Sequence, residues 1–147
     1  MLRKNTVHTF SGKFDVIYNV EEDMLTCEML KFILQPLMEN AMEHGVIPCK
    51  RRGRIEVTGK ITSDHIAEIS ICDNGNGIGD EMLQRLHQEL KKDLQQGVNH
   101  SSSGIGLINV HQRIKNYYGE EFGISVESNQ GEYTCVKVCF PVLREEV

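Results

Sequence analysis

The chain has 147 residues, a formal net charge of −5 and a pI of about 5.7. With 39% hydrophobic and 25% charged residues, its composition is typical of one soluble globular domain and excludes a disordered or fibrous protein. Basic residues cluster only at positions 50–54 (KRRGR), which argues against nucleic acid as a partner. We interpret this short cluster as a solvated loop.

The sequence shows neither a membrane span nor a signal peptide, since no apolar run is long enough to cross a bilayer and the N-terminus lacks an apolar core. We therefore expect the chain to be cytoplasmic. Its cysteines are odd in number, scattered and never spaced as CxxC, which favours reduced thiols over disulfides or a zinc site. They are Cys27, Cys49, Cys72, Cys135 and Cys139.

The first elements are a strand and a helix. Residues 14–20 are rich in β-formers and predict the first strand, and an acidic turn follows it. Apolar residues then recur at three- and four-residue spacing over residues 30–44, which predicts an amphipathic helix. Pro36 lies inside this pattern, so we expect a kink or a new helix start there. Gly45 supplies a stop signal.

The second half begins with a predicted β-hairpin, residues 54–62 and 65–73, whose buried faces carry Ile55, Val57, Ile61, Ala67, Ile69 and Ile71. After a glycine-rich loop come a weak helix over residues 80–96 and a polar, mobile stretch over 95–103. A helix near 104–118 and strands at 124–128 and 133–142 complete the chain. This order predicts a single α+β domain, a two-layer α/β sandwich with a mostly antiparallel sheet and a core over about 14–141.

Asn40 and His44 form the first candidate pair for ligand binding. At 100° per residue they fall on the border of the helix's apolar stripe, where side chains can face a cleft between helix and sheet. An amide oxygen can bind Mg²⁺ without adding negative charge. A lone helical Asn also often caps or is simply solvated, so the position alone leaves both readings open.

Asp73 is the second candidate. It has the strand parity of Ile69 and Ile71, so its carboxylate should point toward the buried face at the end of the strand. The loop that follows, DNGNGIG, contains glycines that let backbone approach a ligand closely. A carboxylate there can accept a hydrogen bond from an exocyclic amine, which adenine has and guanine lacks at that place. Taken alone, such a loop is more often a plain turn.

The third candidate is the start of the predicted helix at Gly104-Ile105-Gly106-Leu107. Exposed backbone N–H groups and the positive end of the helix dipole favour an anion at such a start, and glycine permits close approach. Ser103 precedes it and would otherwise serve only as an N-cap. A lone GxG is weak evidence without the other two segments.

Together the three segments resemble the N, G1 and G2 boxes of the GHKL superfamily, which includes histidine kinases, gyrase, chaperone and mismatch-repair ATPases. The sequence is most similar to LytS-type sensor histidine kinases, whose catalytic domain carries QPLVENAxxHG, DNGxGI and GIGLxNVxxRL followed by YG. The corresponding segments are residues 35–45, 73–78 and 104–114, with Tyr118-Gly119 after them. The resemblance covers nearly all of residues 14–141.

The resemblance implies a Bergerat fold that holds ATP between the sheet and a flexible lid, residues 80–103. It implies that Asn40 binds Mg²⁺, that Asp73 reads the adenine amine, and that His44 either approaches a phosphate or packs in the core. It also implies an adenine pocket and phosphate cradle formed by Gly75, Gly77, Ile78, Ser103, Gly104, Ile105, Gly106 and Leu107.

Two departures from the family pattern are visible. Tyr133-Thr134 replaces the more usual Gly-Thr, which should alter only the local turn, and no histidine lies in a phospho-acceptor context. The sequence therefore looks like a catalytic domain whose partners are a histidine-containing dimerisation segment and a response regulator, within a dimeric, membrane-anchored parent.

Two other functions stay open at this stage: a gyrase- or chaperone-like hydrolytic switch and an anti-sigma-factor serine kinase. Both types use a glutamate base four residues before the Mg²⁺-binding asparagine, and that position here is Pro36. Glu39 is adjacent to Asn40 but points about 100° away from it on the helix.

Overall fold

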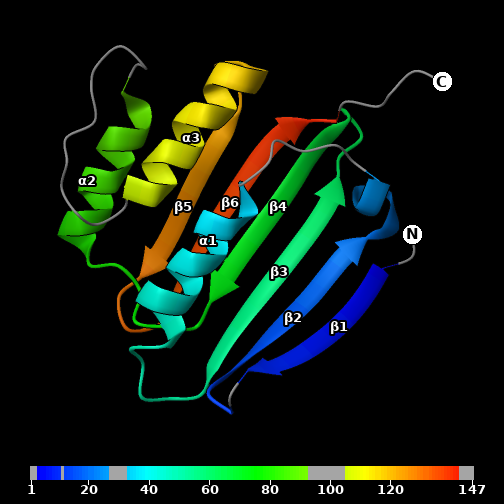
Figure 1. Cartoon of the computed structure of the whole chain (residues 1–147). Helices are drawn as coiled ribbons and strands as arrows, with labels where there is room; N and C mark the ends of the chain where they lie inside the picture. Colours follow the sequence, from blue (N-terminus) through cyan, green and yellow to red (C-terminus); the bar gives the residue numbers. More distant parts are fainter. Residues whose placement is uncertain (1–2, 11, 27–32, 93–104, 143–147) are drawn as a thin grey trace.

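A computed structural model describes residues 3–10, 12–26, 33–92 and 105–142. Strands form one six-stranded sheet in the order β1-β2-β3-β4-β6-β5 (Figure 1). All neighbouring pairs are antiparallel except β2 and β3, which run parallel. The strands are β1 (Arg3–Phe10), β2 (Phe14–Glu21), β3 (Gly53–Ile61), β4 (Ile66–Asp73), β5 (Gly123–Asn129) and β6 (Tyr133–Pro141).

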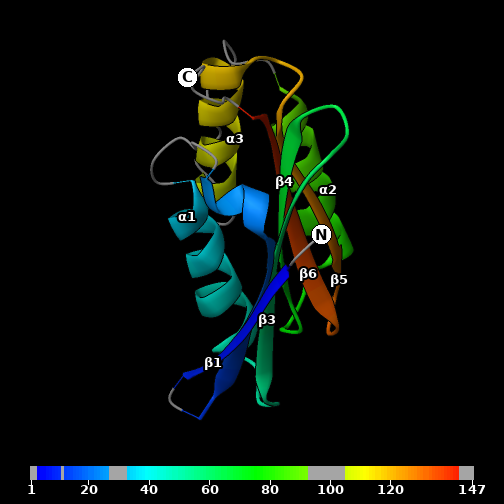
Figure 2. The ribbon, with the colours of Figure 1, turned by 90° about the vertical axis from the view of Figure 1, so that its right-hand side faces the viewer.

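The helices α1 and α3 lie on one side of the sheet (Figure 2). The core forms where they meet it and contains Ile33, Leu37, Ile55, Ile71, Ile114 and Phe140, none of them more than 1% exposed. The predicted α+β two-layer sandwich is confirmed. The helical elements are η1 (Glu22–Thr26), α1 (Leu34–Glu39), η2 (Asn40–Val46), α2 (Asp80–Lys91) and α3 (Ile105–Tyr118). No helix among the described residues is both long and apolar enough to cross a membrane.

The predicted strand over residues 14–20 is β2, and it is the second strand rather than the first. β1 precedes it and pairs with it as an antiparallel hairpin whose turn contains Gly12 at φ 67°. β1 was missed because it is an edge strand of mostly polar residues, whose Val7 stays 62% exposed and leaves no alternation to detect.

The predicted new helix start near Pro36 is confirmed. α1 begins at Leu34, so the proline occupies the third helical position, where its missing N–H has no intrahelical partner to lose. The predicted stop at Gly45 is early by one residue, because η2 continues through Val46. The predicted hairpin, and the burial of its Ile55, Ala67 and Ile71 face, are confirmed as β3 and β4.

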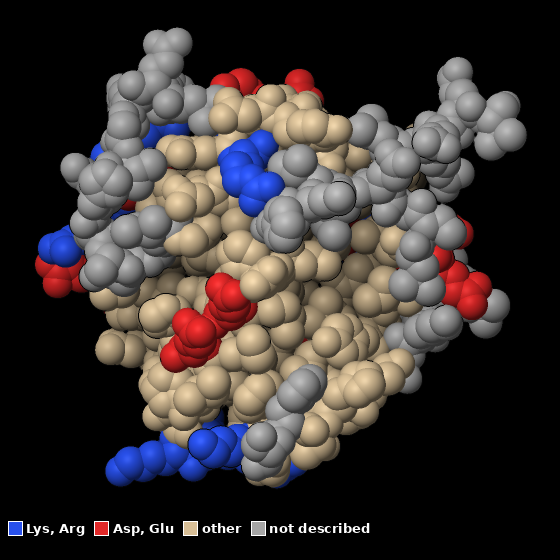
Figure 3. Space-filling model, viewed as in Figure 1, with Lys and Arg blue, Asp and Glu red and all other residues tan. Residues whose placement is uncertain are grey.

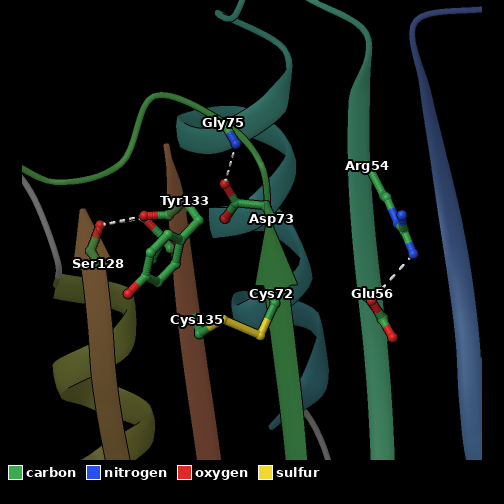
Figure 4. Close-up of a disulfide and its surroundings, with 9 residues drawn as sticks. Arg54, Glu56, Cys72, Asp73, Gly75, Ser128, Tyr133 and Cys135 are labelled. Carbon is green, nitrogen blue, oxygen red and sulfur yellow. Dashed lines mark hydrogen bonds and ion pairs between the residues drawn. A yellow bond between two sulfur atoms is a disulfide. The ribbon is translucent and has the colours of Figure 1, made fainter. Parts of the chain in front are cut away.

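The prediction of reduced thiols is wrong for two of the cysteines. β4 and β6 pair in a register that places Cys72 directly opposite Cys135, with 4.0 Å between their Cα atoms, and a disulfide joins them (Figure 4). Cys49 and Cys139 are free thiols, and Cys27 lies outside the described residues.

The basic cluster is not a solvated loop throughout. Arg52 forms an ion pair with Asp15 at 2.9 Å, and Arg51 donates hydrogen bonds to backbone carbonyls of two other loops. On the face drawn in Figure 3, the described acidic and basic side chains lie in small separate groups between large uncharged areas.

Candidate nucleotide-binding site

A cavity of about 380 Å³ opens where η2, the loop after β4, α2, α3 and the β5–β6 turn meet. The three motifs, far apart in the sequence, each contribute to its walls. Among the described residues the lining consists of Asn40, His44, Gly45, Asp73, Gly77, Ile78, Gly79, Met82, Leu86, Leu107, Gln130 and Thr134. This volume lies within the range of small-molecule sites in proteins.

Asn40, His44 and Gly45 reach the cavity from η2. This segment is a π-helix, a wider turn in which residues four apart lie nearly above one another, and such turns are frequent at functional sites. Asn40 is half-buried and His44 is exposed, so both line the cavity rather than fill the core. The alternative that His44 packs in the core is therefore wrong.

Asp73 ends β4, where its carboxylate lies beside Gly75 of the following loop (Figure 4), and it lines the cavity. It is 4% exposed, and its Oδ1 accepts a hydrogen bond of 2.9 Å from the backbone N–H of Gly75. Burial raises the pKa of this carboxyl to about 6, and the Gly75 N–H works in the opposite direction. The prediction from strand parity that Asp73 faces the buried side is confirmed.

Glycines give the carboxylate and its loop their room. A Cβ on Gly45 would lie 2.6 Å from Asp73 Oδ1, and a Cβ on Gly75 would lie 2.2 Å from the Gly45 carbonyl. Gly77 has a φ of 67°, and a Cβ there would meet the Asn129 carbonyl at 2.2 Å. These glycines therefore serve the packing of the loop itself, whereas the sequence analysis assigned Gly75 and Gly77 to close approach of a ligand and Gly45 to the end of the helix.

The loop is also held by a hydrogen bond to Ser128 of β5. Ser128 Oγ accepts the Ile78 N–H at 2.7 Å and lies 2.8 Å from Thr134 Oγ1. It also donates to the carbonyl of Tyr133 at 2.7 Å. Gly77 and Ile78 line the cavity, while Gly75 donates its backbone N–H to the Asp73 carboxylate.

The third motif is described only in part. Leu107 is 2% exposed and lines the cavity, and Ile105 begins α3. Gly106 is exposed, and among the described residues no atom lies within 4 Å of a Cβ added there. Ser103 and Gly104 lie outside the described residues, as do residues 93–103 of the predicted lid.

Several lining residues were missed by sequence reasoning. Met82 and Leu86 enter from α2, and Gln130 enters from the β5–β6 turn. Thr134 faces the cavity because it pairs directly with Asp73 across β4 and β6. The Thr134 position could have been found if the register of these two strands had been known.

A family model described as histidine kinase-, DNA gyrase B-, and HSP90-like ATPase matches residues 27–144. Sensor histidine kinase YpdA of Escherichia coli is 32% identical over 111 residues, which is 76% of this chain and 18% of that protein. Putative uncharacterized protein YwpD of Bacillus subtilis is 34% identical over 83% of this chain and 40% of its own length. Sensor protein LytS of Oceanobacillus iheyensis is 29% identical over 81% of this chain and 20% of its own length. The chain thus spans less than half the length of these relatives.

Among solved structures, a nucleotide-free form of the catalytic domain of the histidine kinase ThkA superposes with a TM-score of 0.61. The alignment covers 90% of this chain and 82% of that domain at 15% sequence identity. At this identity the likeness concerns the fold alone.

Proposed function

Because the chain belongs to the family of histidine kinase-, DNA gyrase B- and HSP90-like ATPases, we propose that it binds Mg-ATP as the catalytic domain of a sensor histidine kinase. The observation that carries the proposal is the buried Asp73 carboxylate, which points from the sheet into a cavity otherwise lined mainly by apolar and small residues. A carboxylate so placed selects a ligand that can donate a hydrogen bond in a largely apolar pocket.

In this proposal Asp73 accepts a hydrogen bond from the adenine amine. Its Oδ1 is engaged by the Gly75 N–H, so Oδ2 is the oxygen available to the base. Guanine presents a carbonyl at the same place, which would face the carboxylate without a shared proton. Such a mismatch between buried polar groups is the strongest form of ligand discrimination.

Asn40 is the residue that would bind Mg²⁺. The described residues contain no group of three or more His, Cys, Asp or Glu side chains able to hold a metal by themselves. A single amide oxygen fits an ion that arrives with phosphate oxygens and keeps several waters, as Mg²⁺ does with nucleotides. When bound, the ion would neutralise phosphate charge. His44, four residues along η2, lies at the same cavity and would approach a phosphate.

Phosphoryl transfer to a partner is favoured over hydrolysis by the carboxylates of the site. Among the described lining residues Asp73 is the one carboxylate, and the Gly75 N–H already engages it. Glu39 lies outside the lining, exposed, and accepts a hydrogen bond from Gln35 at 3.0 Å. Pro36 occupies the position of the hydrolytic glutamate, so these residues supply no base for water and leave a nucleophile to be brought by a partner.

The partners in this proposal are a histidine-containing dimerisation segment and a response regulator. Relatives named sensor histidine kinases support both in general terms. We further propose that the domain works on the cytoplasmic side of a membrane-anchored, dimeric parent. The anti-sigma serine kinase and hydrolytic-switch alternatives are less well supported, because the similar relatives include proteins named sensor histidine kinases and Pro36 replaces the hydrolytic glutamate.

Calorimetric titration of the chain with ATP, ADP and GTP, each with and without Mg²⁺, tests the proposal. Saturable binding of ATP and ADP with much weaker binding of GTP is the expected result, and equal affinity for GTP would contradict the adenine site. Labelled ATP and a histidine-containing dimerisation segment should then give an acid-labile, base-stable phosphoprotein. An acid-stable product on serine, or turnover of several ATP per second by the chain alone, would favour the alternatives.

A further inference from the structure

Arg51, in the loop between η2 and β3, faces four backbone carbonyls with one guanidinium group. Its Nε donates to the Asn74 carbonyl at 2.9 Å, and its Nη2 donates to the carbonyls of Asn74 and Gly75, the latter at 2.8 Å. The same group reaches the β5–β6 turn, at the carbonyls of Gly131 (3.0 Å) and Glu132 (3.1 Å). A planar fork of five donors suits this arrangement, whereas an ammonium group is a single point of charge.

The two carbonyls on the β4 side belong to the loop that supports Asp73. The Asn74 carbonyl shares its peptide unit with the Gly75 N–H, and that N–H donates to Asp73 Oδ1 at 2.9 Å. Because a peptide unit is planar, a guanidinium that fixes the carbonyl end also fixes the direction of the N–H end. The Gly75 carbonyl likewise shares its peptide with the Asn76 N–H, which points to the Gly45 carbonyl at 3.4 Å.

The loop has further attachments, but their hydrogen bonds do not involve the Asn74 carbonyl or the Gly75 N–H. The Asn74 side chain accepts the Arg54 N–H at 2.7 Å and donates to the Arg52 carbonyl at 3.2 Å, which docks the loop on the start of β3. These contacts locate the Cα of Asn74. The orientation of the Asn74–Gly75 peptide depends on the hydrogen bonds from Arg51 to the Asn74 carbonyl and on the hydrogen bond from the Gly75 N–H to the Asp73 carboxylate.

We propose that Arg51 is a positioning residue for adenine recognition, acting through the Asn74–Gly75 peptide to hold the Asp73 carboxylate in its binding orientation. This inference rests on the proposed function of Asp73. Arg51 itself is not among the residues that line the cavity, so it does not contact the base. It also ties the Gly75 loop to the β5–β6 turn, whose Gln130 lines the cavity from the other side.

A double-mutant cycle between Arg51→Met and Asp73→Asn tests the coupling, with ATP dissociation constants measured by calorimetry well below each variant's melting temperature. Arg51→Met is expected to weaken ATP binding about tenfold, the scale of losing an oriented charge-assisted hydrogen bond. With Asn at position 73, the same substitution should cost less than about twofold, because the group it orients has already lost its charge. Arg52→Met is the matched control, since that guanidinium contacts Asp15 and the Gly12 carbonyl.

Equal losses from Arg51→Met in both backgrounds would overturn the inference, as would an affinity no lower than that of Arg52→Met. Arg51→Lys is expected to give an intermediate loss, and it replaces Met in the cycle if the Met variant does not fold. Failure of the proposed function would look different. Wild-type protein would then not bind ATP, or Asp73→Asn alone would leave the affinity unchanged.

Discussion

The two walls of the cavity are built by different physical means. The loop wall, defined as residues 73–79 with the β5–β6 turn, is held by hydrogen bonds from Arg51 and Ser128 and by glycines that leave no room for a Cβ. The helical wall, α2 and α3, packs through buried side chains such as Leu86 and Leu107. Its hydrogen bonds include those of His87 to the Val126 carbonyl and of His111 to the Leu90 carbonyl. We therefore expect the addition of a single atom to the tightly fitted, hydrogen-bonded backbone of the loop wall to lower the unfolding free energy strongly. Small changes in the apolar packing of the helical wall should have smaller effects.

Alanine at a glycine of each wall should give effects of opposite sign, and the loop wall should show the largest change. In Gly75→Ala the new Cβ would sit 2.2 Å from backbone atoms of Gly45, which cannot move aside without displacing η2. We expect unfolding free energy to fall by about 3–5 kcal/mol. Gly106→Ala, with no atom of the described residues within 4 Å, should raise it by about 0.5–1 kcal/mol through helix propensity. Urea denaturation of both variants measures the difference, and similar small effects would deny the contrast.

Asp73→Asn should separate binding from stability at the loop wall. ATP affinity should fall by about 1–3 kcal/mol, because a neutral amide replaces a charge-assisted acceptor. Unfolding free energy at pH 8 should rise by about 1–2 kcal/mol, since the pKa raised to about 6 means that burial of the ionised carboxylate opposes folding. Calorimetry and urea denaturation give the two values. A variant that loses stability at pH 8 would show that the ionised form is favoured by the fold.

The sequence predicted the parts of the loop wall that depend on local pattern. Strand parity placed Asp73 on the buried face, and the turn residues after it marked the loop. It could not predict Thr134, the Cys72–Cys135 disulfide or the contacts of Arg51, because each depends on which distant segments become neighbours. Cys72 and Cys135 are 63 residues apart in sequence, and their pairing follows from the β4–β6 register alone.

For the helical wall, the sequence predicted both helices and the lining residue Leu107, but not the lining residues of α2. The sequence predicted α3 and, more weakly, α2, but its pattern did not indicate which residues of α2 would face the cavity. Met82 lines it although it is 50% exposed, and Leu86 lines it while 7% exposed. Their side chains are apolar on one helix face for reasons of packing, and the same face borders the cavity.

η2 lies between the two walls, and Asn40→Ala in this segment should weaken ATP binding more when Mg²⁺ is present. We expect Mg-ATP affinity to fall by about 1 kcal/mol more than the affinity for ATP measured with a chelator, because the removed amide oxygen is the proposed ligand of the ion. Titrations in Mg²⁺ and in EDTA give the two losses, with Gln35→Ala on the exposed side of α1 as the control. Equal losses in both buffers would remove Asn40 from the metal site.

The smallest expected effect is a pH dependence at the helical wall, opposite in sign to that of the loop wall. His111 is 7% exposed; its Nδ1 accepts the Ile124 N–H at 2.8 Å, so its Nε2 carries the proton and donates to the Leu90 carbonyl at 2.7 Å. Burial lowers the pKa of His111, chiefly by desolvation, and nearby Lys115 also lowers it while the Leu90 carbonyl and Glu120 raise it. Protonation would set a second N–H against that of Ile124.

Because the folded pKa of His111 lies below the unfolded value of about 6.5, the unfolded chain binds more protons as the pH falls below that value. The stability contributed by neutral His111 is therefore complete above pH 6.5 and is lost on acidification. Asp73 acts the other way: its folded pKa is raised, so stability increases as the pH falls from about 6 toward 4.

The contribution of His111 is measured as the change in unfolding free energy between pH 7.5 and 5.5 in the Asp73→Asn background, where position 73 does not titrate. His111→Gln keeps a donor and an acceptor without titrating, so it should lose less stability than the parent, by up to about 1 kcal/mol. Parallel losses in the two proteins would show that the helical wall does not respond to protonation of this side chain.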